Sequence, residues 1–412
     1  MNNLSRQDCQ RLDLDDPLAV FRDEFQLPID SIYLCGNSLG AMPKKALTVA
    51  AEVVTAQWGI DLVKSWNAHG WFQMATDIGD MLAPTIGAEP GEVVMTDSTS
   101  INLFKVVSAA LMLQPKRYKI LMEGSNFPTD NYTIQGLIKL LGESYEIIFA
   151  EGEDIVSAID DTIAVVCLTQ VHYKTGRVLE MMDITSKAHE VGSVTVWDLC
   201  HSAGAMDVDL NACQADFAIG CTYKYYNGGP GSPAFIFAAK RHHGAALQPL
   251  TGWWGHQAPF NFERDYRPAT GIHQMLTGTQ PIITMAVSKV GIEIATRANI
   301  KQVRQKSLAL GNLFIELLEH HCGDYGFELV SPRDHTRGSQ VALRHDQGYA
   351  IMQALIDAGV VGDFRAPDIL RFGLTPLYLR YVDVWDAVMK LKSIMTEQTW
   401  QLAKYHQRQT VT

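Results

Sequence analysis

The sequence lacks the features that mark exported, membrane-spanning or nucleic-acid-binding proteins. No stretch approaches eighteen consecutive apolar residues, and residues 1–16 contain no apolar signal core, so we expect neither a membrane span nor export. No run rich in lysine and arginine stands out, and the formal net charge is −11. Nucleic acid and anionic membrane surfaces are therefore not expected as partners, and we expect a cytoplasmic protein.

Paired-cysteine and dinucleotide motifs are also missing. The seven cysteines form no C-x-x-C motif, and several lie in apolar runs, which favours small buried side chains in a reducing compartment. No G-x-G-x-x-G follows the first strand candidate, so a nicotinamide enzyme is only a weak alternative. We expect no metal site.

The composition is that of a globular protein with a sizeable core: 47% of the 412 residues are hydrophobic and 19% are charged. Short apolar runs alternate with helical patterns, which predicts an α/β fold with a mostly parallel sheet flanked by helices. The strand candidates are 119–123, 145–150, 163–169, 193–199, 216–221 and 234–239, and helices are predicted at 129–141, 152–160 and 180–191.

The last third of the chain changes character. The patterns predict helices near 300–320, 347–358 and 382–405, and strands at 327–331, 339–344 and 369–373. This indicates a smaller α+β domain over 291–412, beside a large domain over 60–290 and an N-terminal segment, 1–59, that packs with the small domain. A further helix is predicted at 42–58, and segment 251–281 is expected to be a long functional loop.

Two ionisable residues follow neighbouring strand candidates. Asp198 ends one strand, and Lys224 follows the next among aromatic residues and before a glycine-rich turn. Asp198 can cap the following turn, and Lys224 can be a solvated loop lysine. A desolvated lysine can instead form an imine, and pyridoxal 5'-phosphate (PLP) needs a lysine for its aldehyde and a carboxylate for its ring nitrogen. We expect the two residues to be one helix-containing step apart on one edge of the sheet.

Two further segments fit the same cofactor. Segment 96–105 (TDSTSINLFK) places hydroxyl groups before a helical pattern, where a phosphate can bind, although an ordinary N-cap explains it equally. Phe127, which precedes Pro128, could stack on a pyridine ring or could be a core residue.

Nine motifs in order make the chain resemble the kynureninase family, and most closely its bacterial members, among the fold type I PLP enzymes. They are NSLG, TDSTSINLFK, SNFPTD, LTQVHYKTG, WDLCHSAGA, CTYKYYNGGPG, GWWGH, GTQPI and RFGLTPLY, and the resemblance extends from YLCGNSLG (33–40) to RFGLTPLY (371–378). One departure is visible, because Cys35 stands before GNSLG where we expect an acidic residue.

The resemblance implies a role for each matched residue. Lys224 would hold PLP as a Schiff base, Asp198 would pair with the ring nitrogen, Phe127 would stack on the ring, and Arg371 would bind the substrate α-carboxylate. The other implied cofactor contacts are Thr99, Ser100 and Tyr223 at the phosphate, Asp130, Thr169 and His201 around the ring, and Trp253 and Thr279 from the neighbouring subunit of a homodimer. Ser38 would touch the substrate, and Tyr223 would share proton transfer with Lys224.

The implied reaction is the hydrolysis of L-kynurenine to anthranilate and L-alanine, with the 3-hydroxy substrate left open. Gly278 offers no side-chain donor, which favours the unsubstituted substrate. The alternatives are a cysteine desulfurase, for which Cys322 in HHCGD has the most loop-like context, a class V aminotransferase, or a non-catalytic small-molecule binding protein on an α/β scaffold.

Overall fold

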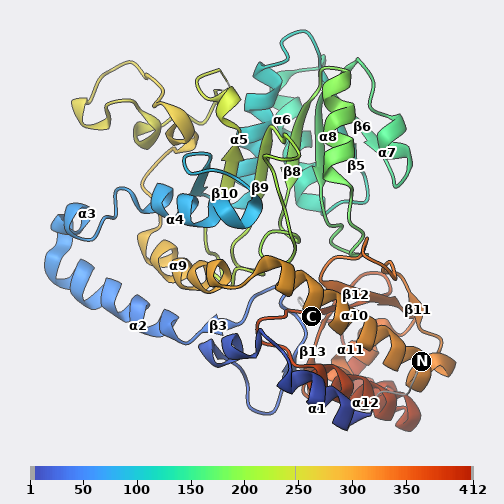
Figure 1. Cartoon of the computed structure of the whole chain (residues 1–412). Helices are drawn as coiled ribbons and strands as arrows, with labels where there is room; N and C mark the ends of the chain where they lie inside the picture. Colours follow the sequence, from blue (N-terminus) through green and yellow to red (C-terminus); the bar gives the residue numbers. More distant parts are fainter. Residues whose placement is uncertain (1–4, 246, 410–412) are drawn as a thin grey trace.

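The computed structural model describes residues 5–245 and 247–409, and a seven-stranded sheet forms its larger part (Figure 1). The strand order is β4-β10-β9-β8-β7-β5-β6. The bounds are β4 (Val93–Thr96), β5 (Lys119–Glu123), β6 (Glu146–Ala150), β7 (Ile163–Thr169), β8 (Val194–Asp198), β9 (Phe217–Gly220) and β10 (Ala234–Ala238). All of these pairings are parallel except the two made by β10. The predicted mostly parallel sheet is confirmed.

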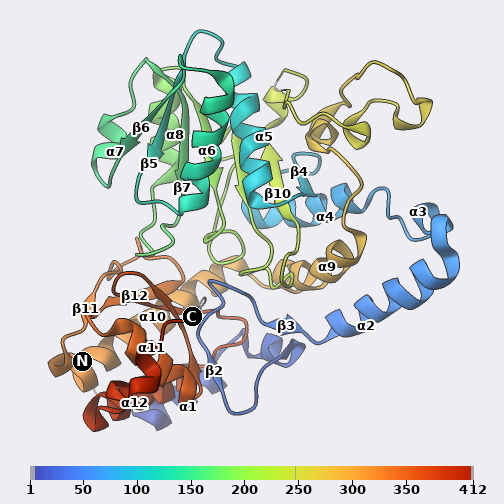
Figure 2. The ribbon, with the colours of Figure 1, turned by 180° about the vertical axis from the view of Figure 1, so that it is seen from behind.

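Helices flank this sheet because the central strands are apolar on both faces. Strands β7 and β8 are buried at every position, so both faces need a cover. The helices here are α4 (Met74–Leu82), α5 (Thr99–Met112), α6 (Pro128–Leu141), α7 (Asp154–Ser157) and α8 (Met181–Glu190). Helices α5 and α6 pack side by side (Figure 2).

Three details of this part differ from the sequence-based predictions. Strand β4 was not predicted, and the helix expected over 152–160 is the single turn α7. The connection between β8 and β9 consists of turns and not of a helix, so the expected helix-containing step between Asp198 and Lys224 is wrong. The two residues still follow adjacent parallel strands.

A second, four-stranded antiparallel sheet has the order β11-β12-β15-β14. Its elements and the helices around it are α10 (Ile300–Cys322), β11 (Glu328–Leu329), β12 (Gln340–Arg344), α11 (Gly348–Asp357), β13 (Val360–Val361), β14 (Asp363–Arg365), β15 (Ile369–Gly373) and α12 (Tyr381–Glu397). The helix predicted over 382–405 therefore ends at Glu397, and β13 and β14 were not predicted. This sheet has an apolar core of its own.

The beginning of the chain packs on its end. Helix α1 (Arg6–Leu14) contacts α12, and β2 (Ile32–Tyr33) pairs in parallel with β13. Strand β1 (Phe25–Gln26) pairs with β3 (Met42–Pro43), and α9 (Ile282–Arg297) connects the two halves, since it contributes side chains to both apolar cores. The expected domain boundaries after residues 59 and 290 stay a prediction.

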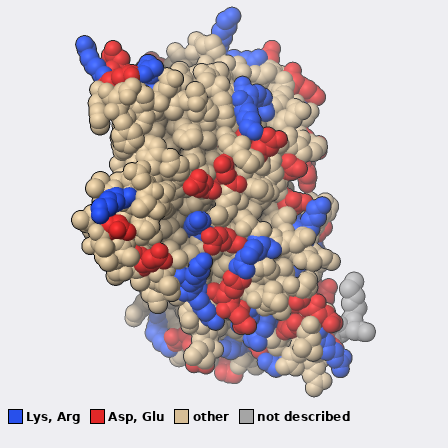
Figure 3. Space-filling view, turned by 60° about the vertical axis from the view of Figure 1, so that its left-hand side comes forward, with Lys and Arg blue, Asp and Glu red and all other residues tan. Residues whose placement is uncertain are grey.

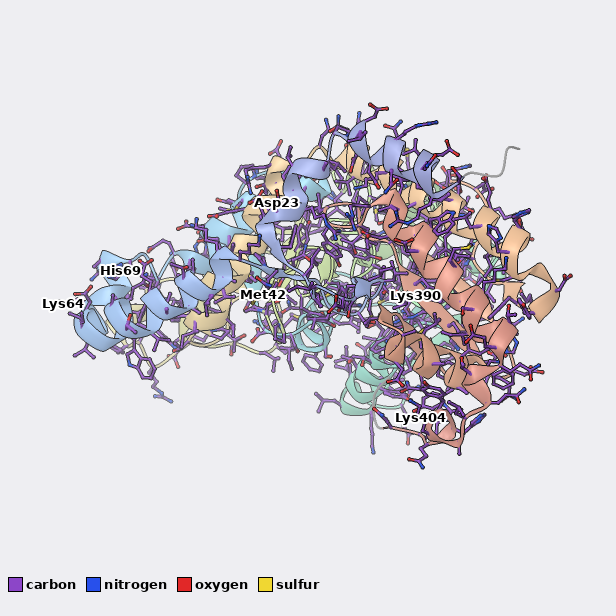
Figure 4. The ribbon with its side chains drawn as sticks, turned by 90° about the horizontal axis from the view of Figure 1, so that it is seen from below. Asp23, Met42, Lys64, His69, Lys390 and Lys404 are labelled. Atoms are coloured by element: carbon purple, nitrogen blue, oxygen red, sulfur yellow. The ribbon has the colours of Figure 1, made fainter. Side chains whose placement is uncertain are left out.

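A helical arm projects from the body between these halves (Figures 1 and 4). It begins as α2 (Lys45–Glu52), continues as a π-helical segment (Val53–Asp61) and reaches α3 (Ser65–Ala68). Met42 lies near the base of the arm, and Lys64 and His69 lie at its far end (Figure 4). Over Lys45–Ala68 the arm is long and apolar enough to cross a membrane by length and composition, although it carries polar residues throughout, and only 11% of its most apolar window is buried.

The charged surface side chains do not separate by sign on the face that Figure 3 shows. Lysines and arginines lie among aspartates and glutamates over the lower part of that face, and a broad area above them is uncharged. This face therefore presents no extended positive patch of the kind that binds nucleic acid.

Candidate active site

A cavity of about 480 Å³ lies between the two sheets and collects most of the predicted site residues. The predicted residues that line it are Ser38, Thr99, Ser100, Phe127, Asp130, Asp198, His201, Tyr223, Lys224 and Arg371. Ligands of open α/β sheets bind outside the carboxyl ends of the strands. The polar residues after β4, β8 and β9 meet there for this reason.

Lys224 stands beside a neutral imidazole in this cavity. Its Nζ lies 2.9 Å from His201 Nε2. Burial, followed by the nearby charge of Lys224, lowers the pKa of His201 well below its ordinary value. With Nε2 accepting from Lys224, the imidazole proton resides on Nδ1, which is buried and has no partner among the described residues.

Two carboxyl groups meet at one side of the cavity. Asp198 ends β8, and its Oδ1 accepts a hydrogen bond of 2.7 Å from the backbone N–H of Cys200, so it caps the following turn and also faces the cavity. Asp130 is 3% exposed. Burial and then the negative charge of Asp198 raise the pKa of Asp130 well above its ordinary value. Asp130 therefore takes up a proton more readily than an ordinary carboxyl group.

The N-terminus of α5 forms another wall. Ser98 is the N-cap residue, whose Oγ accepts from the backbone N–H of Ile101 at 3.4 Å. The N-cap interpretation is thus right for Ser98, while Thr99 and Ser100 begin the helix and line the cavity. Free N–H groups and hydroxyls at the start of a fourteen-residue helix suit a phosphate.

Asp97 precedes this helix and was missed by the sequence analysis. It has a left-handed φ of 43°, lines the cavity, and accepts a hydrogen bond of 2.5 Å from Lys105 Nζ. The fully buried Lys105 also donates to the carbonyl of Met275 at 2.8 Å. Its charge offsets the negative charge of Asp97 beside the α5 N-terminus.

Phe127 lines the cavity, whereas Thr169 lies outside its lining. Phe127 is 46% exposed and edge-on to Tyr173, with ring centroids 5.2 Å apart, so the alternative of a core phenylalanine is wrong. Thr169 is buried outside the cavity lining and donates to Asn126 Oδ1 at 2.8 Å. It contacts the residues that hold Asp130, whose Oδ2 accepts from Asn126 Nδ2 at 2.9 Å.

Arg371 lies at the opposite end from α5 and belongs to a cluster of charged groups. Its Nε donates to Asp363 Oδ1 at 2.7 Å, and its Nη2 donates to Ser38 Oγ at 3.0 Å. Arg365 lines the cavity beside it. Hydrogen bonds to Asp363 from Arg371 and Ser38 hold the pKa of this carboxyl below its ordinary value, although its burial acts in the opposite direction.

Cys35 contacts the same cluster. Its Sγ lies 3.7 Å from Asp363 Oδ2. Burial and then the charge of Asp363 raise the pKa of Cys35 to about 12. The thiol is thus uncharged at the position where the sequence analysis expected an acidic residue.

Trp253 and Thr279 do not reach the cavity of their own chain. Trp253 is 42% exposed, Thr279 is exposed, and neither lines the cavity. The segment that contains them, 251–281, has only short 3-10 turns, as expected of a long loop. The neighbouring Trp254 is buried and stacks on Phe72 at 5.0 Å.

Tyr173, Asp363 and Arg365 also belong to this site and were not predicted from the sequence. Tyr173 lies inside the quoted motif LTQVHYKTG and lines the cavity. Asp363 and Arg365 belong to the unpredicted strand β14, so nothing in the pattern placed them near Arg371. Among the described residues no group of three or more His, Cys, Asp or Glu side chains could hold a metal ion.

Solved structures with the same fold define the class first. A cysteine desulfurase from Thermococcus onnurineus NA1 superimposes with a TM-score of 0.77 at 18% identity, over 92% of this chain and 98% of that chain. A variant of C-DES with glycine covalently linked to its PLP cofactor gives a TM-score of 0.77 at 15% identity, over 90% and 98%. The fold is that of the fold type I PLP enzymes.

Sequence relatives identify the family. The chain is 49% identical to a kynureninase of Burkholderia pseudomallei (strain 1106a) over 414 aligned positions, which cover 99% of this chain and all of that protein. A kynureninase of Pseudomonas fluorescens matches at the same identity and coverage. Residues 303–391 match the model of the kynureninase C-terminal domain. The chain belongs to the kynureninase family.

Proposed function

We propose that this protein hydrolyses L-kynurenine to anthranilate and L-alanine with PLP as its cofactor. The observation that carries the proposal is Lys224, which lines a cavity between two sheets together with Asp198, in a chain whose family is established over its full length. An imine-forming lysine and a carboxylate facing one cavity are the two partners that PLP requires.

The residues present fit this cofactor. The unpartnered Nδ1 of His201 is a buried polar group that lacks an acceptor, and the start of α5 offers Thr99 and Ser100 to a phosphate. The exposed ring of Phe127 offers a stacking face. Lys224 would hold the aldehyde carbon, and Asp198 would hold the ring nitrogen.

When bound, PLP would supply an electron sink for the negative charge that develops on the substrate. Lys224 Nζ would be freed when the substrate amine takes its place, and would then take up and pass on the Cα proton. Asp198 would face the ring nitrogen, with Asp130 beside it as the carboxyl of raised pKa. Water would add to the γ-carbonyl carbon, and cleavage of the Cβ–Cγ bond would leave anthranilate, with the bonding electrons passing to the sink and a proton then added at Cβ to give alanine.

Tyr223 supplies a proton donor near Lys224. The charge of neighbouring Cys221 and then burial raise the pKa of Tyr223 above its ordinary value. The phenol therefore stays protonated and can pass its hydroxyl proton to the lysine amine. The Lys224 Nζ lies 5.7 Å from the Tyr223 ring centroid, so the two groups occupy the same part of the cavity.

The decisive experiment compares the cofactor-loaded protein with its Lys224→Ala variant. We expect anthranilate fluorescence from L-kynurenine, and a fall in turnover of roughly a thousandfold or more in the variant because it lacks both the anchor and the proton carrier. Lys187→Ala is the matched control, since this half-buried lysine on α8 pairs with Glu190 and does not line the cavity. Borohydride reduction followed by peptide mass analysis should place the cofactor on Lys224.

Continued multiple turnover by Lys224→Ala would refute the mechanism, and the absence of anthranilate from the unaltered protein would refute the function. Sulfide release from cysteine would favour the desulfurase alternative. That alternative needs a mobile nucleophilic cysteine, and Cys322 is instead the buried last residue of α10, where burial raises its pKa to about 11. The loop context predicted for Cys322 is wrong.

The aryl ring of the substrate is proposed to carry no 3-hydroxyl group. Gly278 has open space around its Cα and does not line the cavity of its own chain, so in a site shared with a second copy it would offer no side-chain donor to a 3-hydroxyl group. The kcat/KM for L-kynurenine should therefore exceed that for the 3-hydroxy substrate in the same assay.

The assembly is proposed to be a homodimer with shared sites. Trp253 and Thr279 lie outside their own cavity, where a second copy could receive them. The arm adds apolar surface that the described chain leaves uncovered, including Trp58 at 57% exposure, Ile60 at 74% and Val63 at 76%. At its root, Val53, Trp58, Trp71 and residues 281–284 line an apolar groove of about 390 Å³. Such exposed apolar area favours association with a second copy.

The cytoplasm is the proposed location. All seven cysteines are free thiols, and six of them are buried, which is typical of proteins that work in a reducing compartment.

A further inference from the structure

Four side chains from two distant parts of the chain form one charged cluster in the cavity, away from α5. Asp363 and Arg371 face each other on the antiparallel strands β14 and β15, and Ser38 and Arg365 complete the cluster. Ser38 Oγ contacts Asp363 Oδ2 and lies 3.0 Å from Arg371 Nη2 and 3.2 Å from Arg365 Nη2. Arg365 Nη2 lies 3.1 Å from Asp363 Oδ2.

Arg371 has little capacity left for a ligand while this cluster is intact. Its Nε and Nη2 both donate to Asp363, its Nη2 also donates to Ser38, and its Nη1 donates to the carbonyl of Tyr173. A guanidinium carries five N–H groups, so these bonds leave one on Nη1. A carboxylate that enters the cavity therefore cannot take a two-point grip on Arg371 alone.

Arg365 has the hydrogen-bond donors for a ligand that Arg371 lacks. Its Nε is buried and has no acceptor among the described residues, and its Nη1 makes one long bond of 3.3 Å to the carbonyl of Phe364. The side chain is 32% exposed and lines the cavity, whereas that of Arg371 is 1% exposed. A ligand can thus reach Arg365 and give it an acceptor.

The charges of the cluster also favour the binding of an anion beside Arg365. Two guanidinium groups face one carboxylate, and the Cys35 thiol beside Asp363 adds no charge. Burial, followed by repulsion from Arg371, lowers the pKa of Arg365. A second anion would relieve this repulsion, and the described residues that line the cavity offer no further carboxylate at this end.

We propose that Arg365 is a second binding residue for the α-carboxylate of the amino-acid substrate, and that Asp363 is the positioning residue that holds Arg365 beside Arg371. The inference rests on the proposed amino-acid substrate. It assigns the free donors of Arg365 to the carboxylate, with Arg371 contributing its remaining N–H group.

The test measures binding of a ligand with and without a carboxylate. L-alanine and L-alaninamide are titrated into the cofactor-loaded protein, and the change in cofactor absorbance gives each Kd. Arg365→Gln should raise the Kd of L-alanine roughly tenfold or more, the usual effect of losing a charge-assisted hydrogen bond. The Kd of L-alaninamide should change by less than about twofold, because its amide carries no charge.

The control and a second variant separate binding from folding. Arg344→Gln removes an arginine of the same sheet that pairs with Glu328 and Asp368 outside the cavity, and it should leave both constants unchanged. Arg365→Lys keeps the charge without the planar fork and should weaken L-alanine by an intermediate factor. Equal weakening of both ligands by Arg365→Gln, or of both by Arg365→Lys if the first variant does not fold, overturns the proposal.

The unaltered protein is assayed with L-kynurenine in the same preparation. Anthranilate release together with equal weakening of the two ligands overturns this inference and leaves the proposed function standing. No anthranilate release overturns the proposed function and this inference with it.

Discussion

At the scale of single residues, the two buried carboxyl groups of the cavity are expected to have different tasks. Asp130 is 3% exposed, and burial and then the negative charge of Asp198 raise its pKa. Asp130 therefore takes up a proton more readily than an ordinary carboxyl group. We expect Asp198, at the end of β8, to be the anionic partner of a ring nitrogen.

This difference predicts opposite outcomes for two matched substitutions. Asp130→Asn replaces a neutral carboxyl by a neutral amide of the same shape, so kcat for L-kynurenine should fall by less than about tenfold. Asp198→Asn removes the charge that keeps the ring nitrogen protonated, so kcat should fall by roughly a hundredfold or more. Steady-state kinetics at pH 7 with saturating cofactor measure both. A larger loss from Asp130→Asn than from Asp198→Asn would show that the charge resides on Asp130.

The residues of the site that the sequence predicts are those that follow strands of the parallel sheet. Asp198 and Lys224 could be found because parallel strands bring their carboxyl ends to one edge. Arg365 could not be found in this way. Its place depends on the pairing of β14 with β15 and on Ser38, which is 327 residues away in the sequence. The resemblance to the kynureninase family predicted Arg371 and Ser38 as substrate-binding residues, but it did not predict which side chains they contact.

At the scale of elements, one buried carboxylate ties the start of β9 to its neighbours. Asp216 accepts hydrogen bonds from the backbone N–H and hydroxyl of Thr195 at 2.8 and 2.9 Å, and from Arg241 at 2.7 Å. His189 and His242 lie 2.8 and 2.7 Å from its oxygens. Burial alone would raise the pKa of Asp216, but these hydrogen bonds hold it well below its ordinary value of 3.8. The group joins β8, β9 and α8.

Substitution of Asp216 should therefore destabilise the fold in a pH-dependent way. Because the pKa is lower in the folded state, the stabilisation is fully present above pH 3.8 and is lost as the pH falls below that value. Asp216→Asn should lower the free energy of unfolding by about 3–5 kcal/mol at pH 7, the usual loss when one partner of a buried ion pair is removed.

Urea unfolding of the cofactor-free protein at pH 7, pH 5 and pH 3 measures this effect. The difference between Asp216→Asn and the unaltered protein should be smaller at pH 3 than at pH 5, because the carboxylate of the unfolded chain takes up its proton in this interval. The exposed Asp161 supplies a control, since Asp161→Asn should not move the midpoint. A difference that is larger at pH 3 than at pH 5 would contradict the role of the ionised carboxylate.

Sequence patterns predict the elements whose apolar residues form an uninterrupted run or recur at a regular spacing. Strands β5 and β7 have the predicted bounds because their apolar runs are uninterrupted. The helix expected at 42–58 exists as α2 and its π-helical continuation, but its direction could not be predicted. An apolar helix usually packs into the core of its own chain, and this one leaves Leu47 70% exposed. Within the described chain, nothing in the sequence pattern of this helix predicts that its apolar side chains stay exposed.

At the scale of the whole molecule, the arm and the loop 251–281 both expose large apolar or aromatic side chains of a kind that is usually buried. The aromatic side chains of the two segments join in one cluster, with Trp66 and Trp254 at 5.3 Å and Trp253 and Trp254 at 4.7 Å between ring centroids. Trp253 packs against this cluster and is 42% exposed. A partly exposed aromatic residue suits a contact with a second copy.

If Trp253 serves the neighbour's cavity, two inactive variants should restore activity to each other. In a mixed dimer of Lys224→Ala and Trp253→Ala, the cavity of the second chain keeps its own Lys224 and receives an intact Trp253 from the first. The opposite cavity lacks both residues. Random pairing makes half of the dimers mixed with one working site in two, so co-expression should give about a quarter of the full activity.

The control pairs Lys224→Ala with Asp198→Asn. Both of these residues line the cavity of their own chain, so every site in the mixture lacks one of them and no activity should return. Differently tagged chains, purified in succession through both tags, isolate the mixed dimers, whose activity should be about half that of the unaltered protein. Failure of Trp253→Ala to complement Lys224→Ala in isolated mixed dimers would place Trp253 outside the neighbour's site. Recovery with Trp253→Ala and none with Asp198→Asn follows only if each site draws on two chains, because a residue that acts within its own chain cannot repair a defect in that chain's partner.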